Sequence, residues 1–172
     1  MRTRRLDNHL TVSLNLLESR VLWHVLDQIQ QHYRCTPQEL DPKIANAWYS
    51  TRGCQSAGMT AEETQEWLAN LREIKGSCLP LLEEWCHQLA SIQEGNVQLR
   101  IALDDAPTLL QALNDQRLLA AASCDIGQPE MDIHSPDAIA QLPSAQQNAL
   151  FQIHFLALVM EEILARLEHG AA

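Results

Sequence analysis

The chain has 172 residues, the length of one ordinary domain, and we predict a single domain over residues 1–172. It carries 22 Asp and Glu against 12 Lys and Arg, so its net charge is −10 at pH 7. A phosphate backbone needs clustered Lys and Arg, so this balance argues against a nucleic-acid-binding groove. No stretch approaches the roughly 18 apolar residues that cross a bilayer, so we also expect no membrane partner.

The basic residues are unevenly distributed along the chain. Arg2, Arg4 and Arg5 come first, and removing these three leaves 9 basic and 22 acidic residues, a balance of −13. No apolar segment follows them, so the sequence predicts no secretory signal. The Arg-rich start could be a short basic arm for an acidic partner. We favour a flexible basic tip over residues 1–8, because chain ends fray when nothing ties them down.

The five cysteines are odd in number and widely spaced, and no two form a C-x-x-C motif. Since no export signal precedes them, we expect a reducing compartment, free thiols and a cytoplasmic location. Small buried hydrophobic groups are the expected role for most of them. They are Cys35, Cys54, Cys78, Cys86 and Cys124.

Capping signals and apolar spacing predict a mainly α fold, a bundle of about five to six helices. Asn15 stands three residues before Glu18, the spacing of a capping box, and Pro80 predicts a break in the long middle helix. The predicted helices are Leu16–Tyr33, Pro37–Tyr49 (one or two short ones), Thr60 to about Gln93 with a break near Ser77–Pro80, Asp104 or Asp105 to Ser123, and Ala145–Glu168.

The remaining segments are predicted as loops and strands. Residues 50–58 form a loop, and residues 125–143 form a long connection in which Ser135-Pro136 could start one helical turn. Two segments alternate apolar and polar residues, which predicts strands with one buried face, paired as a minor two-stranded β element. Their apolar positions are Leu10, Val12 and Leu14, and Val97, Leu99, Ile101 and Leu103.

One segment resembles a known family. Residues 110–118 (LQALNDQRL) are similar to the "aLNDxRL" core of a bacterial family of uncharacterised proteins, domain-of-unknown-function family 2017. Members also open with a short strand and a helix with an early Glu, like Leu10–Glu18, and close with an apolar helix, like Phe151–Leu167. The resemblance implies a fold, and it implies no activity, cofactor or catalytic residue.

Asn114, Asp115 and Arg117 within this segment are the first candidate site. Asp115 and Arg117 are two residues apart on a predicted helix, so they point to different sides and do not pair with each other. They could form a polar site between helices, with Arg117 binding an anion. We favour a structural interpretation, in which Arg117 pairs with a carboxylate elsewhere and Asn114 bonds to backbone.

Two further pairs are candidates. Trp48 and Tyr49 end a short helix beside a loop, so we expect them to be partly exposed and to mark a partner site. Glu84 and His87 have the E-x-x-H spacing of di-iron bundles, which need a second copy and two more Glu, such as Glu18 and Glu162. We find one copy and prefer a solvated pair.

The sequence contains no phosphate-binding loop and no nucleophile elbow, and we predict no catalytic residue, cofactor or metal. We expect the last helix, which is apolar over much of its circumference, to be central or to form one face of an oligomer interface. The leading hypothesis is a non-enzymatic interaction, adaptor or regulatory module in the cytoplasm. Its protein partner would be basic or would present an apolar groove, and self-association stays open. The alternative is an enzyme or metalloprotein with an interhelical site at Glu84, His87, Asp115, Arg117 and Glu162.

Overall fold

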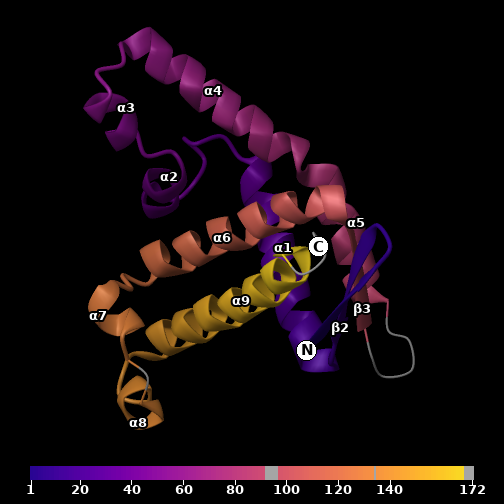
Figure 1. Cartoon of the computed structure of the whole chain (residues 1–172). Helices are drawn as coiled ribbons and strands as arrows, with labels where there is room; N and C mark the ends of the chain where they lie inside the picture. Colours follow the sequence, from indigo (N-terminus) through magenta and orange to yellow (C-terminus); the bar gives the residue numbers. More distant parts are fainter. Residues whose placement is uncertain (92–96, 134, 169–172) are drawn as a thin grey trace.

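The computed structural model describes residues 1–91, 97–133 and 135–168 and confirms a mainly α fold with a minor β element (Figure 1). The elements are β1 (Arg2–Leu6), β2 (His9–Leu14), α1 (Leu16–Arg34), α2 (Pro42–Trp48), α3 (Arg52–Ser56), α4 (Ala61–Ser77), α5 (Leu79–Ala90), β3 (Val97–Ala102), a 3-10 turn η1 (Leu103–Asp105), α6 (Ala106–Ser123), α7 (Gln128–Met131), α8 (Pro136–Ile139) and α9 (Ser144–Glu168).

The two predicted strands pair antiparallel, as expected. Their buried residues face each other across the ladder, Leu10 with Ile101 and Val12 with Leu99, because both strands present alternate side chains to the same face of the sheet. This apolar face packs against α1, α5 and α9. Leu103, expected in the second strand, belongs to the 3-10 turn.

The expectation of a frayed basic tip is wrong for Arg2–Leu6, which form the third strand of the sheet in the order β1-β2-β3. The two-residue connection Asp7-Asn8 joins β1 to β2, and Asp7 adopts a left-handed φ of 49°, which Asp tolerates in tight hairpins. Thr3 pairs with Val12 and is 2% exposed. One buried side chain and a full ladder therefore hold this basic segment in place.

The predicted helix starts are mostly confirmed. Both halves of a capping box are formed at Asn15 and at Thr60, and Cys78 separates α4 from α5 where the break was expected. Differences occur where the sequence offers weak signals. The predicted loop at 50–58 contains α3, the connection at 125–143 contains α7 as well as the expected turn α8, and only residues 42–48 of the 37–49 segment are helical. The predicted end near Gln93 lies outside the described residues.

The core is built around α1, which packs against α5, α6, α4 and β2. Leu22, Leu26, Leu82, Trp85 and Leu113 are inaccessible there. The last helix, α9, runs beside α6 (Figure 1) and buries one face while exposing the other. Among the described residues, no helix combines the length and hydropathy that crossing a bilayer requires.

The docking of β1 can be tested through Thr3, whose buried hydroxyl has no hydrogen-bond partner among the described residues. Thr3→Val keeps the shape and removes the unsatisfied oxygen, so it is expected to raise the free energy of unfolding by about 1 kcal/mol. Thr11→Val, at the half-buried Thr on the outer face of β2, is the matched control and should change stability by less than about 0.5 kcal/mol. Equal effects in urea denaturation would contradict the buried position of Thr3.

Candidate functional site

Four elements meet at a buried lysine. Lys75, near the end of α4, has a side chain that is 3% exposed, and it forms an ion pair with Asp115 of α6, whose side chain is 13% exposed. Tyr33 from the end of α1 and Trp48 from the end of α2 complete the group. We call Lys75, Asp115, Tyr33 and Trp48 the lysine cluster.

Hydrogen bonds and aromatic rings fix the geometry of the lysine cluster. The Tyr33 hydroxyl donates to Asp115 Oδ2 at 2.7 Å, and Trp48 Nε1 donates to the Asp115 carbonyl oxygen at 2.9 Å. The Lys75 Nζ lies 4.9 Å from the centre of the Tyr33 ring and 4.8 Å from that of Trp48. A cation at this distance from two aromatic rings is attracted by both, which offsets part of the cost of burying its charge.

The electrostatics of the cluster keep Tyr33 a hydrogen-bond donor. Burial raises the pKa of Tyr33 above its ordinary value of 10, and the negative charge and hydrogen bond of Asp115 raise it further. The phenol is therefore neutral at physiological pH. A lysine nucleophile needs an accessible, neutral amine. Lys75 is instead enclosed and paired with a carboxylate, so the arrangement favours a structural tie between helices.

The structure brings together two of the predicted candidate residues, Asp115 and Trp48, although they were expected to belong to separate sites. The prediction that Trp48 and Tyr49 are partly exposed is wrong, since both are buried. The indole of Trp48 packs edge-on against Tyr33, with ring centres 5.5 Å apart, and its N–H is used by Asp115. Because the Trp48 ring packs against Tyr33 and its N–H is hydrogen-bonded, burial of this side chain is favourable.

The neighbours of Asp115 do not join the cluster. Asn114 is exposed on α6, and Arg117 is half-buried with its Nε lacking a hydrogen-bond partner among the described residues. No carboxylate in the described ranges lies within ion-pair distance of Arg117, so the expected pairing of Arg117 is not seen there. Anion binding by Arg117 stays a prediction.

The E-x-x-H pair lies on the exposed side of α5. Glu84 accepts a hydrogen bond from Gln88 at 3.1 Å, and His87 is exposed. Within residues 1–91, 97–133 and 135–168, no three His, Cys, Asp or Glu side chains come close enough to share a metal ion. Asp115 is bound to Lys75 and Tyr33, and it does not join Glu84 and His87 in an interhelical site.

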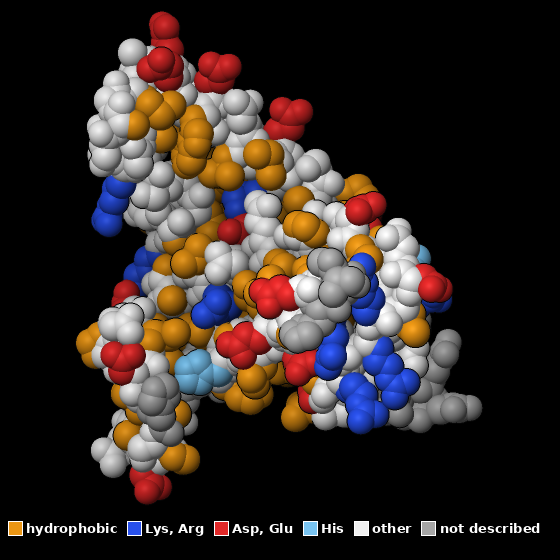
Figure 2. Space-filling model, in the orientation of Figure 1, with side chains coloured by type: hydrophobic (Ala, Val, Ile, Leu, Met, Phe, Trp, Pro, Cys, Tyr) orange, Lys and Arg blue, Asp and Glu red, His pale blue; other side chains and the backbone are white. Residues whose placement is uncertain are grey.

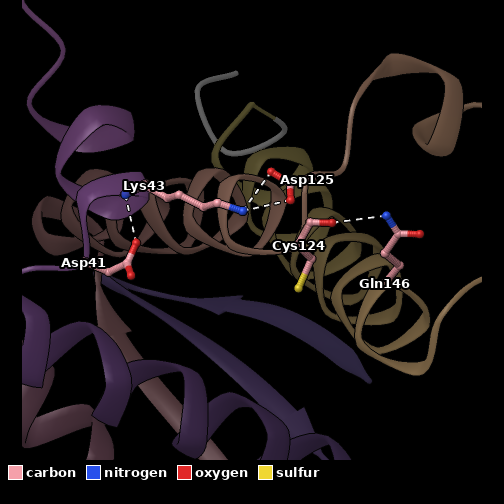
Figure 3. A network of polar contacts seen from close by, with 5 residues as sticks. All are labelled: Asp41, Lys43, Cys124, Asp125 and Gln146. Carbon is pink, nitrogen blue, oxygen red and sulfur yellow. Dashed lines mark hydrogen bonds and ion pairs between the residues drawn. The ribbon is translucent and has the colours of Figure 1, made fainter.

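An open groove of about 600 Å³ lies between α2, α3 and the end of α6. Lys43 and Asp125 face each other on its wall, with Lys43 Nζ at 2.9 and 2.8 Å from the two carboxylate oxygens (Figure 3). The Asp41 carboxylate accepts from the Lys43 backbone N–H and caps α2, and Gln146 of α9 donates to the Cys124 carbonyl. These contacts join α2, α6 and α9, and Asp125 already neutralises Lys43.

The sequence identified Asp115 and missed Lys75 and Tyr33. Lys75 belongs to an amphipathic helix in which a lone lysine ordinarily faces water. The partners of Asp115 are 40 and 82 residues away along the chain, so no local pattern connects them. Comparisons of the chain with protein-family models, with curated proteins and with solved structures found no match.

The lysine cluster predicts a strong coupling between Lys75 and Asp115. Asp115→Asn is expected to lower the free energy of unfolding by about 3 kcal/mol because it leaves a buried cation uncompensated. Lys75→Met should cost less, about 2 kcal/mol, since Asp115 keeps its bond from Tyr33 and some contact with water. The double variant should lose less than the sum, with a coupling of at least about 1 kcal/mol in denaturant unfolding.

Lys43, the other lysine of the chain, provides the matched control. Its ion pair with Asp125 has side chains that are 50% and 77% exposed, so Lys43→Met should leave the free energy of unfolding nearly unchanged. Additive effects of the Lys75 and Asp115 substitutions would contradict the proposed coupling.

His32 makes stability depend on pH. Burial lowers the pKa of His32 below its ordinary value of 6.5, and its Nδ1 is enclosed without a hydrogen-bond partner among the described residues. Because the folded state has the lower pKa, this contribution to stability is present above pH 6.5 and is lost as the pH falls through the folded-state pKa.

In denaturant unfolding, the wild-type chain is therefore expected to lose more stability between about pH 7.5 and pH 5.5 than the His32→Gln variant. The imidazole signals of His32 in a proton NMR titration should move at a pH below those of an unfolded peptide. An equal loss of stability in both chains would show that His32 does not carry this dependence.

Proposed function

We propose that the chain is a non-enzymatic interaction module that binds a protein partner through the exposed apolar row of α9. The observation that carries the proposal is this row, Phe151, Phe155 and Leu158, on the longest described helix. Aromatic and aliphatic side chains left in water on a helix are costly unless a partner covers them.

The three side chains form one continuous surface. They are spaced by four and three residues, which places them on the same side of a helix. Phe151 and Leu158 are 59% and 57% exposed, whereas the opposite side of α9 is buried against α6. The rings of Phe151 and Phe155 are stacked with centres 6.4 Å apart, and Phe155 also packs against the core. Phe155 therefore holds Phe151 in a fixed position for a partner.

The charges around the row describe the partner. Glu161 is exposed and Glu162 is half-buried, three and four residues after Leu158, and Figure 2 shows acidic and hydrophobic side chains together on the surface of α9. A partner that presents an apolar groove with a basic rim would match both features. We also propose a cytoplasmic location and membership of domain-of-unknown-function family 2017, both of which the sequence suggested.

An enzyme or metalloprotein has less support. Its suggested residues are spread over the molecule, with Asp115 inside the lysine cluster and with Glu84 and His87 on the exposed side of α5. Within residues 1–91, 97–133 and 135–168, no three His, Cys, Asp or Glu side chains come together as a metal site would require.

The proposal is tested with the variant Phe151→Ser/Leu158→Ser in a native pull-down with quantitative mass spectrometry. We expect the wild-type chain to capture a protein that the variant captures about tenfold less, because apolar anchors at the centre of an interface dominate its affinity. The captured protein is then purified, and its direct binding to both chains is measured by titration calorimetry.

Leu17→Ser/Ile74→Ser is the matched control, since it removes two exposed aliphatic side chains from α1 and α4. It should bind as the wild type does. Equal losses in both variants, or direct binding that is unchanged by Phe151→Ser/Leu158→Ser, would overturn the proposal. If light scattering shows that the wild-type chain is a dimer and that this variant is a monomer, the partner is a second copy of the chain.

A further inference from the structure

The sheet is a basic surface on an acidic protein. Its three strands include Arg2, Arg4, Arg5 and Arg100 and no Asp or Glu, although the chain has 22 acidic residues. Lys and Arg side chains gather over the sheet in Figure 2. The segment that the sequence suggested as a basic arm or tip is therefore part of a folded, positively charged surface.

Three of these arginines lie on the outer face of the sheet, opposite the helices. Side chains alternate between the two faces of a sheet, so the exposed Arg2 and Arg4 lie on the face opposite the buried Thr3. In β3, the exposed Arg100 follows the buried Leu99 in the same way. The outer face is thus reached by its side chains alone, and a ligand there needs no backbone group of the strands.

The pairing of the strands places these arginines in two adjacent rows. Arg4 pairs with Thr11, which pairs with Arg100, so the side chain of Thr11 lies between those of two arginines. In the next row of the same face, Arg2 pairs with Ser13. Guanidinium and hydroxyl groups both donate hydrogen bonds to anions, so these two rows present donors that suit carboxylates.

The arginines of the outer face have no counter-charge across the described residues, where none of Arg2, Arg4 and Arg100 forms an ion pair. Strand spacing separates the backbones of Arg4 and Arg100 by about 10 Å, and strand rise separates those of Arg2 and Arg4 by about 7 Å. Like charges at such distances repel each other when nothing compensates them. An anion that contacts all three would remove this repulsion.

We propose that the outer face of the sheet binds a short acidic segment of a partner protein, whose Asp and Glu side chains contact Arg2, Arg4 and Arg100. Residues two and three apart in an extended chain are separated by about 7 and 10 Å, which are the spacings of the arginines. A segment with three acidic residues within about six positions therefore reaches all of them. This surface differs from the apolar row of α9 in its elements and in its charge.

Long polyanions fit the outer face less well than a short acidic segment does. A nucleic acid or an anionic bilayer extends far beyond the sheet, so it would also face the rest of a chain whose net charge is −10. The three strands contain no Phe, Trp or Tyr on which bases could stack. A short segment meets the arginines and avoids most of the acidic surface.

The test uses the full-length chain and a dye-labelled peptide of alternating Glu and Ser in fluorescence anisotropy at low salt. We expect saturable binding that weakens as salt is added, and no binding of the matching Lys-Ser peptide. Arg4→Glu/Arg100→Glu should weaken binding by about tenfold or more, because two attractions become repulsions. Arg4→Lys/Arg100→Lys, which keeps both charges, should retain most of the binding.

Two control variants separate this surface from general charge and from the apolar row of α9. Arg52→Glu/Arg72→Glu changes two exposed arginines of α3 and α4 by the same charge and should leave binding nearly unchanged. Phe151→Ser/Leu158→Ser should bind the peptide as the wild type does. The outcome for the sheet is therefore independent of the outcome for α9.

NMR spectra locate the bound peptide. The Glu-Ser peptide should shift the side-chain N–H signals of Arg2, Arg4 and Arg100 and the backbone amide signals of the three strands. Equal weakening by the two charge-reversal variants, or signal changes confined to other elements, would overturn the proposal. Tighter binding of a single-stranded oligonucleotide of equal charge, or of phosphatidylserine vesicles, would overturn it in favour of a different anion.

Discussion

The position of α4 depends on one buried ion pair. Of the 17 residues of this helix, all of them described, Lys75 is the one that is buried, whereas helices normally dock through several apolar side chains. The charge of Lys75 is compensated by Asp115 and by the faces of Tyr33 and Trp48, which are themselves fixed by bonds to Asp115. Half-buried apolar groups such as Leu68 and Leu71 add to this contact. A charge removed from water in this way specifies one geometry, since few alternative positions of α4 would satisfy it.

Asp115 connects this tie to the rest of the molecule through α6. On one side α6 contacts α2 and α1, whose ends carry Trp48 and Tyr33, and it also packs against α9. A second cluster of apolar residues, including Leu150 and Ile153 of α9 and Ala120 of α6, makes that contact. With one face of α9 used in this way, its other face, which carries Phe151 and Leu158, is left to solvent.

The sequence was informative where the pattern is local. The capping box at Asn15 and Glu18, the break before Pro80 and the alternation around Val12 and Leu99 depend on neighbouring residues, and the structure has all of them. β1 was missed because three of its five residues are Arg and a single one, Thr3, is buried. Such a segment is recognisable as a strand only from its pairing with β2.

The candidate site was predictable in part for the same reason. Asp115 stood out as a polar residue on an apolar helix, but its contacts with Lys75 and Tyr33 span distant parts of the chain and leave no periodic signal. Trp48 was expected in water because it ends a short helix, and local position could not reveal that Tyr33 and the Asp115 carbonyl would enclose it.

The net charge of −10 conceals a separation of charge that follows from this architecture. Acidic side chains such as Glu18, Asp41 and Glu63 are used at helix starts, where the helix dipole and free N–H groups stabilise them. Strands offer no such positions, and the sheet carries arginine without carboxylates. Acidic side chains at helix starts and arginine side chains in the sheet are therefore carried by different kinds of element.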